Sequence, residues 1–150
     1  MMRKGGLIFW VAVFAVGFSL MNSTLSSEAG NEAKEGVFIH IKSGPDEGHS
    51  VLMALQMAKI MCESKDVLVY VDVDGVSVLA KDGPDLKMEP FGSSRAAIGE
   101  LISKGVTVMA CPGCMKAKGV DKEDLMEGVQ VAQKDAFFEF TSGRILSLTY

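Results

Sequence analysis

The sequence predicts a three-layer α/β domain in which a mostly parallel five-stranded sheet is covered by helices on both faces. Two observations support this prediction. Short β-branched runs alternate along the chain with stretches whose apolar residues recur at three- and four-residue steps, a pattern typical of βα units. Two of the runs, 67–73 and 106–110, are almost wholly apolar, as expected for strands buried on both faces of a parallel sheet.

The N-terminus predicts an export signal that precedes the domain. Arg3 and Lys4 are followed by an uncharged apolar run over 7–21, and Ser27-Glu28-Ala29 places small residues where a signal peptidase cuts. The apolar run is about fifteen residues long, short of the roughly twenty needed to span a bilayer. We therefore expect residues 1–29 to be a cleaved signal peptide of an exported, periplasmic protein. An uncleaved anchor is the alternative.

After residues 1–29, a polar lead-in at 30–35 precedes a single domain at 36–150. The chain without its signal has 13 basic and 18 acidic side chains, a formal charge of −5. A mildly acidic domain without a basic stripe has no electrostatic reason to bind nucleic acid. We expect contact with the membrane only through the signal segment.

The first predicted βα unit joins a strand over 37–41 to a helix that ends near Ser64. The turn-rich segment 43–48 separates them, and Ser50 is the predicted N-cap. His40 lies within the strand, where we expect a hydrogen-bonded core residue rather than a base. His49 lies in the loop. His49 would lie at the same edge of the sheet as Cys111 if the strands that precede these two residues, 37–41 and 106–110, are neighbours.

The second predicted strand spans 67–73 and is followed by Asp74-Gly75. This dipeptide favours either a β-hairpin or a turn into a short helix over 76–81, and the alternation of strands and helices favours the helix. The segment 81–92 has no clear periodicity and contains Gly83-Pro84 and Glu89-Pro90. We expect a surface loop there.

The third unit begins with Ser93 or Ser94 as the N-cap of a helix that Gly105 ends in a left-handed conformation. The strand 106–110 follows and leads into Cys111-Pro112-Gly113-Cys114. Beyond it, Asp121 and Asp124 resemble a capping arrangement. The apolar spacing over 125–132 predicts a helix that continues, alone or with a second helix, to 141–143, and a last strand is expected over 145–150.

Cys111 and Cys114 are the candidate catalytic residues. They follow a buried strand, and the carboxyl ends of parallel strands are where α/β folds place their chemistry. If Cys111 caps the following turn, backbone N–H groups would favour its thiolate. Pro112, Gly113 and His49 are the candidate binding residues. We expect neither a cofactor nor a structural metal, because a closed zinc site needs four ligands.

These residues occur in a pattern that resembles the DsrE/DsrF-like family of small sulfur-handling proteins, with its YchN-like fold. The matching segments are Val37 to Ile41, Asp74-Gly75-Val76, and the run from Glu100 through the two cysteines to Val129. The resemblance implies a five-stranded α/β domain that assembles into dimers, trimers or hexamers. It also implies a cysteine at the end of the fourth strand, here Cys111, that carries persulfide sulfur between donor and acceptor proteins or small sulfane-sulfur compounds.

Three functions remain open at this stage. The first is a sulfur carrier or sulfurtransferase-like protein in which Cys111 accepts a sulfane sulfur and Cys114 resolves or protects the persulfide. The second is a thiol–disulfide oxidoreductase that uses both cysteines. The third is a non-enzymatic, exported oligomeric binding module whose cysteines are structural or bind metal transiently. A fold by itself does not choose among them.

Overall fold

A computed structural model describes residues 35–150, so the predicted signal peptide and most of the lead-in lie outside the described residues. The central sheet has five strands in the order β6-β5-β2-β1-β7, and all four neighbouring pairs are parallel. Its strands are β1 Glu35–Ile41, β2 Asp66–Val71, β5 Thr107–Ala110, β6 Gln130–Val131 and β7 Arg144–Thr149. The predicted five-stranded α/β fold is therefore confirmed.

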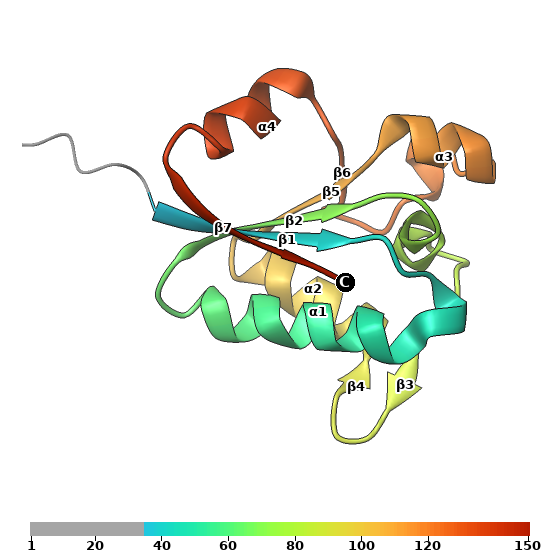
Figure 1. The fold of residues 1–150 in the computed structure, drawn as a ribbon. Helices are drawn as coiled ribbons and strands as arrows, with labels where there is room; N and C mark the ends of the chain where they lie inside the picture. The colour runs from blue at the N-terminus through green and yellow to red at the C-terminus, as the bar shows by residue number, and fades with distance from the viewer. Residues whose placement is uncertain (1–34) are drawn as a thin grey trace, which may run out of the picture. The chain divides into compact units, whose positions relative to one another are not determined.

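Helices cover both faces of this sheet (Figure 1). On one face, α1 packs on β1 and β2 while α2 packs on α1 and β5. On the other, α4 lies over the sheet, and α3 follows directly from the end of β5. The helices are α1 Gly48–Met61, α2 Ser94–Ser103, α3 Pro112–Lys118 and α4 Lys134–Phe140, with 3-10 turns η1 Pro45–Glu47, η2 Gly75–Leu79 and η3 Lys122–Asp124.

The core lies between the sheet and the α1/α2 layer. Alternate residues of β1 point into it, and Val37, Ile39 and Ile41 are each at most 3% exposed. Leu55 of α1 and Leu101 of α2 fill the space above them and are at most 2% exposed. The opposite face of β1 carries Phe38 and His40, which are only half-buried because α4 is short.

Several local predictions are confirmed. Ser93 is the N-cap of α2, since its hydroxyl accepts the N–H of Ala96 at 3.1 Å. Gly105 follows α2 with a φ of 84°, in the left-handed region where glycine has no steric penalty. Asp74-Gly75 leads into η2 and not into a hairpin, because β2 is already paired with β1 and β5. Asp121 and Asp124 form a capping box at η3.

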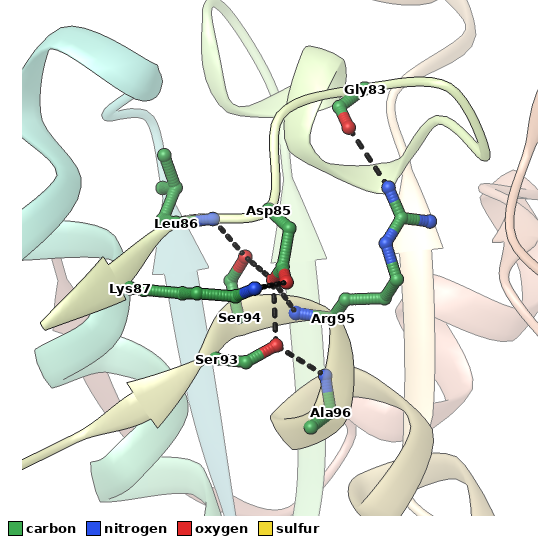
Figure 2. A network of polar contacts seen from close by, with 8 residues as sticks. All are labelled: Gly83, Asp85, Leu86, Lys87, Ser93, Ser94, Arg95 and Ala96. Carbon is green, nitrogen blue, oxygen red and sulfur yellow. Dashed lines mark hydrogen bonds and ion pairs between the residues drawn. The ribbon is translucent and has the colours of Figure 1, made fainter.

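The segment predicted as a loop at 81–92 contains a two-stranded antiparallel hairpin, β3 Lys87–Met88 and β4 Gly92–Ser93. Figure 2 shows how Asp85 ties this hairpin to α2. Its carboxylate accepts the Ser93 hydroxyl at 2.6 Å and the Arg95 N–H at 3.1 Å, and Lys87 lies 3.2 Å away. The hydrogen bond from Ser93, only partly opposed by burial, lowers the pKa of Asp85 to about 2.

Two helix predictions were wrong. Helix α1 begins at Gly48, not after Ser50, and the Ser50 hydroxyl accepts a hydrogen bond from Ser43 at 3.2 Å. No helix covers 125–132. Leu125 bridges to Ala80, Gly128 has a φ of 84°, and the chain then enters β6 at the sheet edge. The helix-like spacing arises because these apolar side chains pack on η2 and α2 from an irregular segment.

Candidate functional site

Cys111 lies at the carboxyl edge of the sheet, where β5 ends and α3 begins. Its N–H donates to the carbonyl of Val71 at 2.9 Å, which extends the β2–β5 pairing by one residue. Its backbone is extended, with φ −66° and ψ 119°, and Pro112 takes the first position of α3. Proline suits that position because its fixed φ is helical and it needs no hydrogen-bond acceptor. Cys111 is therefore the N-cap of α3.

Helix α3 is short, and one side chain anchors it to the rest of the domain. Met115 is its only buried residue, at 5% exposed. Gly119 ends the helix with a φ of 66°, and its N–H donates to the carbonyl of Lys116. This anchor keeps Cys114 in the first turn, beside Cys111. All three cysteines of the chain, Cys62 included, are free thiols of intermediate exposure.

The surroundings of Cys111 favour its thiolate. Partial burial works to raise the pKa of the thiol, as it does for any group that becomes an anion. The Tyr70 hydroxyl, the Cys114 and Gly113 N–H groups and the Cys114 thiol lie near the sulfur, favour its anionic form and together outweigh burial. The pKa of Cys111 is consequently below its ordinary value, as expected for a reactive cysteine.

Tyr70 is held in place by an aromatic cluster under α4. Its ring packs against Phe38 and Phe137 with ring centroids 6.0 and 5.5 Å apart, and against His40 at 5.8 Å. Burial, followed by the hydrogen bond to Cys111, raises the pKa of Tyr70. The phenol therefore keeps its proton at physiological pH and remains a hydrogen-bond donor to the thiolate.

Cys114 has the opposite tendency. Burial raises the pKa of its thiol, the neighbouring Cys111 and the Asp72 carboxylate raise it further, and the Val73 N–H lowers it only in part. Val73 has a φ of 46°, in the left-handed region that a β-branched residue rarely adopts. The two thiols thus differ, because the pKa is lowered at Cys111 and raised at Cys114.

Asp72 and His40 form a close polar pair beside the thiols. His40 Nε2 lies 2.9 Å from Asp72 Oδ2, and both side chains are about one-fifth exposed. Neither His40 Nε2 nor Asp72 Oδ1, although both atoms are buried, has an aligned hydrogen-bond partner. The prediction of a hydrogen-bonded core histidine was therefore wrong for this nitrogen. Buried polar groups left unsatisfied are costly, and they concentrate at functional sites.

Sequence reasoning missed Tyr70, Asp72 and Val73 as site residues. The sequence did contain a signal for Tyr70 and Asp72. They are two positions apart at the end of β2, so their side chains point to the same face of the sheet. The strand order that places this face next to Cys111 was the missing information. With β2 adjacent to β5, Tyr70 pairs with Met109, two residues before Cys111.

His49 is not brought to the cysteines. The expectation depended on β1 and β5 being neighbours, but β2 lies between them. His49 is in the first turn of α1, where its ring packs against Phe91 of the β3–β4 hairpin at 5.4 Å. His49 lines a cavity of about 770 Å³ between α1, the hairpin and Tyr150. Neither Cys111 nor Cys114 lines this cavity.

Pro112 and Gly113 do lie at the thiols. A Cβ at residue 113 would lie 3.9 Å from the Cys111 sulfur. Pro112 lines a hollow of about 260 Å³ with Tyr70, Phe137, Ala132, Gln133 and Lys134. The hollow is adjacent to Cys111, because Pro112 follows Cys111 in the chain and the Tyr70 hydroxyl is near enough to its sulfur to lower the pKa of the thiol.

Within residues 35–150, no group of three or more His, Cys, Asp or Glu side chains is arranged to hold a metal ion. In the same part of the chain, no helix has both the length and the apolar character needed to cross a membrane.

The fold and the site together define a parallel α/β protein with a thiol of lowered pKa at the carboxyl edge of its sheet. Residues 35–143 match the DsrE/DsrF-like family, and the chain belongs to that family. An uncharacterized protein of Methanopyrus kandleri, MK0008, is 29% identical over 102 residues, which are 67% of this chain and 82% of that protein.

Two solved structures have the same fold. The ychN protein from E. coli superposes with a TM-score of 0.62 at 18% sequence identity, over 79% of this chain and 99% of that one. The protein of unknown function MTH1491 from Methanobacterium thermoautotrophicum has a TM-score of 0.57 at 24% identity, over 77% of this chain and 99% of that one. At these identities the likeness establishes the fold.

Proposed function

We propose that this protein is a sulfur carrier in which Cys111 holds sulfane sulfur as a persulfide. The Cys111 thiolate attacks the outer sulfur of a donor persulfide, R–S–SH. The S–S bond of the donor breaks, Cys111–S–SH forms, and R–S⁻ leaves. An acceptor thiolate then attacks the outer sulfur of Cys111–S–SH and regenerates the Cys111 thiolate. No external oxidant or reductant is needed, and membership of the DsrE/DsrF-like family supports a sulfur relay role.

One observation supports this function most strongly, namely the position of Cys111 at the carboxyl edge of the sheet, near polar hydrogens that lower the pKa of its thiol. The Tyr70 hydroxyl comes from β2, while the N–H groups of Gly113 and Cys114 come from α3. A thiolate stabilised in this way is the reactive form of cysteine toward sulfane sulfur. The adjacent hollow of about 260 Å³ gives a small sulfane-sulfur compound, or the cysteine-bearing segment of a protein, access to it.

The test is the intact mass of the reduced protein after exposure to a persulfide donor. We expect the wild type to gain the mass of one sulfur atom, the Cys111→Ser variant to gain none, and a Cys62→Ser variant to load like the wild type. Cys62 is the matched control, because its thiol is also half-buried but donates to the Lys59 carbonyl at 3.2 Å. Equal loading of wild type and Cys111→Ser would refute the proposal.

A second candidate function is thiol–disulfide exchange, which the nearness of the Cys114 thiol to Cys111, one helical turn away, favours. Two cysteines in such contact can close a disulfide in an oxidising compartment. Mild oxidation followed by mass mapping tests this function. A Cys111–Cys114 disulfide that is reversibly reduced by a protein substrate would support it, and failure to form the disulfide would exclude it.

We also propose that the protein acts outside the cytoplasm as a homo-oligomer that exchanges sulfur with protein partners. The charged start and apolar run of residues 1–21 support export. Phe138 of α4 and Leu146 of β7 are more than half exposed, which leaves apolar surface for a second subunit. N-terminal sequencing of protein from the periplasmic fraction and sedimentation analysis test these two proposals. Full-length cytoplasmic protein, or a monomer at all concentrations, would contradict them.

A further inference from the structure

The hollow of about 260 Å³ opens beside Cys111 on the side of the sheet that carries α3 and α4 (Figure 1). Its place follows from the backbone. Tyr70, which lines the hollow, pairs with Met109, two residues before Cys111, so Tyr70 and Cys111 share one face of the sheet. The Cys111 N–H donates to the Val71 carbonyl at 2.9 Å, which keeps Cys111 in this register. Pro112, the next residue, also lines the hollow, so a molecule held there would lie next to the Cys111 thiol.

Two aromatic rings form the walls of the hollow. The rings of Tyr70 and Phe137 meet edge to face, with centroids 5.5 Å apart and an angle of 68° between their planes. Phe38 packs against both, at 6.0 Å from Tyr70 and 5.5 Å from Phe137, and so holds one wall on β2 and the other on α4. Alkyl groups and sulfur atoms pack favourably against aromatic rings. The walls therefore suit the alkyl part of a small sulfur compound.

Lys134 places a positive charge at this hollow. Its side chain is exposed, and none of the ion pairs among residues 35–150 involves it. Asp135 does not neutralise it across the helix, because adjacent positions of a helix do not face each other. The lysines that carboxylates do hold in this part of the chain are Lys59, Lys65, Lys87, Lys104 and Lys118. An ammonium group without a partner beside aromatic walls favours a ligand with an anionic end.

We propose that this hollow is the donor subsite of the sulfur transfer, that the donor is a small alkyl persulfide with a carboxylate, and that Lys134 recognises the carboxylate. This inference rests on the proposed sulfur-carrier function of Cys111. The alkyl part lies against the aromatic walls while the outer sulfur meets Cys111, and the leaving R–S⁻ departs with its carboxylate. A volume of 260 Å³ is that of roughly nine water molecules at about 30 Å³ each, which suits a compound the size of one amino acid.

Lys116 of α3 is the matched control for Lys134. It lines a separate groove of about 450 Å³, which shares Pro112 and Gln133 with the hollow but has neither aromatic wall. Lys116 is also exposed and also outside the ion pairs of residues 35–150. Replacing either lysine with glutamine therefore removes the same charge. Charges more than about 8 Å apart are largely screened at physiological ionic strength, so only the lysine that contacts the ligand should discriminate.

The first experiment measures binding without any sulfur transfer. N-acetyl-S-methylcysteine carries the carboxylate and an unreactive thioether, and its amide is the uncharged counterpart. Each compound is titrated as a protector of Cys111 against iodoacetamide, read by peptide mass mapping. We expect the carboxylate to protect at about threefold lower concentration than the amide, as one exposed ion pair allows. Lys134→Gln should abolish this preference and Lys116→Gln should retain it. A carboxylate that protects no better than the amide, or a preference that survives in Lys134→Gln, would overturn the inference.

The second experiment measures single-turnover loading of Cys111 from N-acetylcysteine persulfide and from the persulfide of its amide, followed as the gain of one sulfur atom in intact mass. The ratio of the two rates within each variant cancels any effect of the substitution on the nucleophile itself. We expect this ratio to be about threefold lower in Lys134→Gln than in the wild type, and unchanged in Lys116→Gln. Equal ratios in the wild type and Lys134→Gln would overturn the inference and leave the carrier function standing. Failure of the wild type to load from either donor would instead refute the sulfur-carrier function.

Discussion

The Tyr70 hydroxyl on β2 lies near the Cys111 sulfur at the end of β5 and lowers the pKa of its thiol, and this contact links the aromatic cluster under α4 to Cys111. The contact follows from the sheet register. Tyr70 pairs with Met109, so its side chain lies on the same face as that of Cys111 two residues further along. A strand order without β2 beside β5 would separate them.

Replacing Tyr70 with phenylalanine should raise the pKa of Cys111, because the thiolate loses its hydroxyl donor while its burial is retained. The loss of one hydrogen bond to a charged group corresponds to about one pKa unit, and hence to about tenfold slower alkylation at neutral pH. The measurement is the pH dependence of iodoacetamide modification at Cys111, read by peptide mass mapping. Tyr150→Phe is the matched control, since Tyr150 lines the cavity beside His49. An unchanged profile in Tyr70→Phe would show that the hydroxyl does not stabilise the thiolate.

Asp85 should make the folded state sensitive to acid. Its pKa is about 2 in the folded protein and near 3.8 when unfolded, so the ionised carboxylate stabilises the fold. This contribution is complete above about pH 4 and is lost as the pH falls toward 2. Asp85→Asn should cost about 1 kcal/mol at pH 7, with the difference from wild type shrinking below pH 4. Urea denaturation at a series of pH values measures it, and a constant difference down to pH 2 would contradict the assignment.

The parts of the fold that the sequence predicted well are those in which one simple period dominates. The strands β1, β2, β5 and β7 are β-branched runs bounded by glycine, proline or polar turns. Helix α2 has a serine cap and a left-handed glycine at its end. Each of these signals is local, because it arises from the backbone and from one buried face.

The region 125–132 shows why the rest could not be predicted. Leu125 and Met126 have helical spacing with Val129, but Met126 donates its N–H to Leu79 and Leu125 bridges to Ala80. These partners come from η2, about 45 residues earlier in the chain, and spacing does not report them. The same limit applies to the site. Cys111 and Cys114 are only three residues apart in the sequence, whereas Tyr70 and Asp72 join them only through the strand order.

Gly128 should not tolerate a side chain. A Cβ there would lie 2.5 Å from Cγ2 of Ile102, and the φ of 84° is itself unfavourable for alanine. Together, the overlap and the strain should lower the free energy of unfolding of Gly128→Ala by about 2–4 kcal/mol. Gly92→Ala separates the two causes, because Gly92 has a φ of 75° with no atom near the added Cβ. It should cost about 1–2 kcal/mol. Equal losses in urea denaturation would show that Ile102 moves aside.

Met115→Ala should affect both stability and chemistry. Met115 is the single buried side chain of α3, so its truncation should cost about 2–4 kcal/mol and loosen the helix whose first N–H groups lower the pKa of Cys111. The pKa of Cys111 should then rise, with slower alkylation at neutral pH. Leu101→Ala, in a fully buried residue of α2, should cost a similar amount without changing the alkylation profile.

The comparison of these two variants separates the local role of α3 from global stability. If both variants shift the pKa of Cys111 equally, the thiolate depends on the stability of the whole domain. If only Met115→Ala shifts it, the thiolate depends on the position of α3, because the N–H groups of Gly113 and Cys114 lower that pKa only when they lie close to the sulfur. We expect the second result, since the remaining donor, Tyr70, is held by Phe38 and Phe137 independently of Met115.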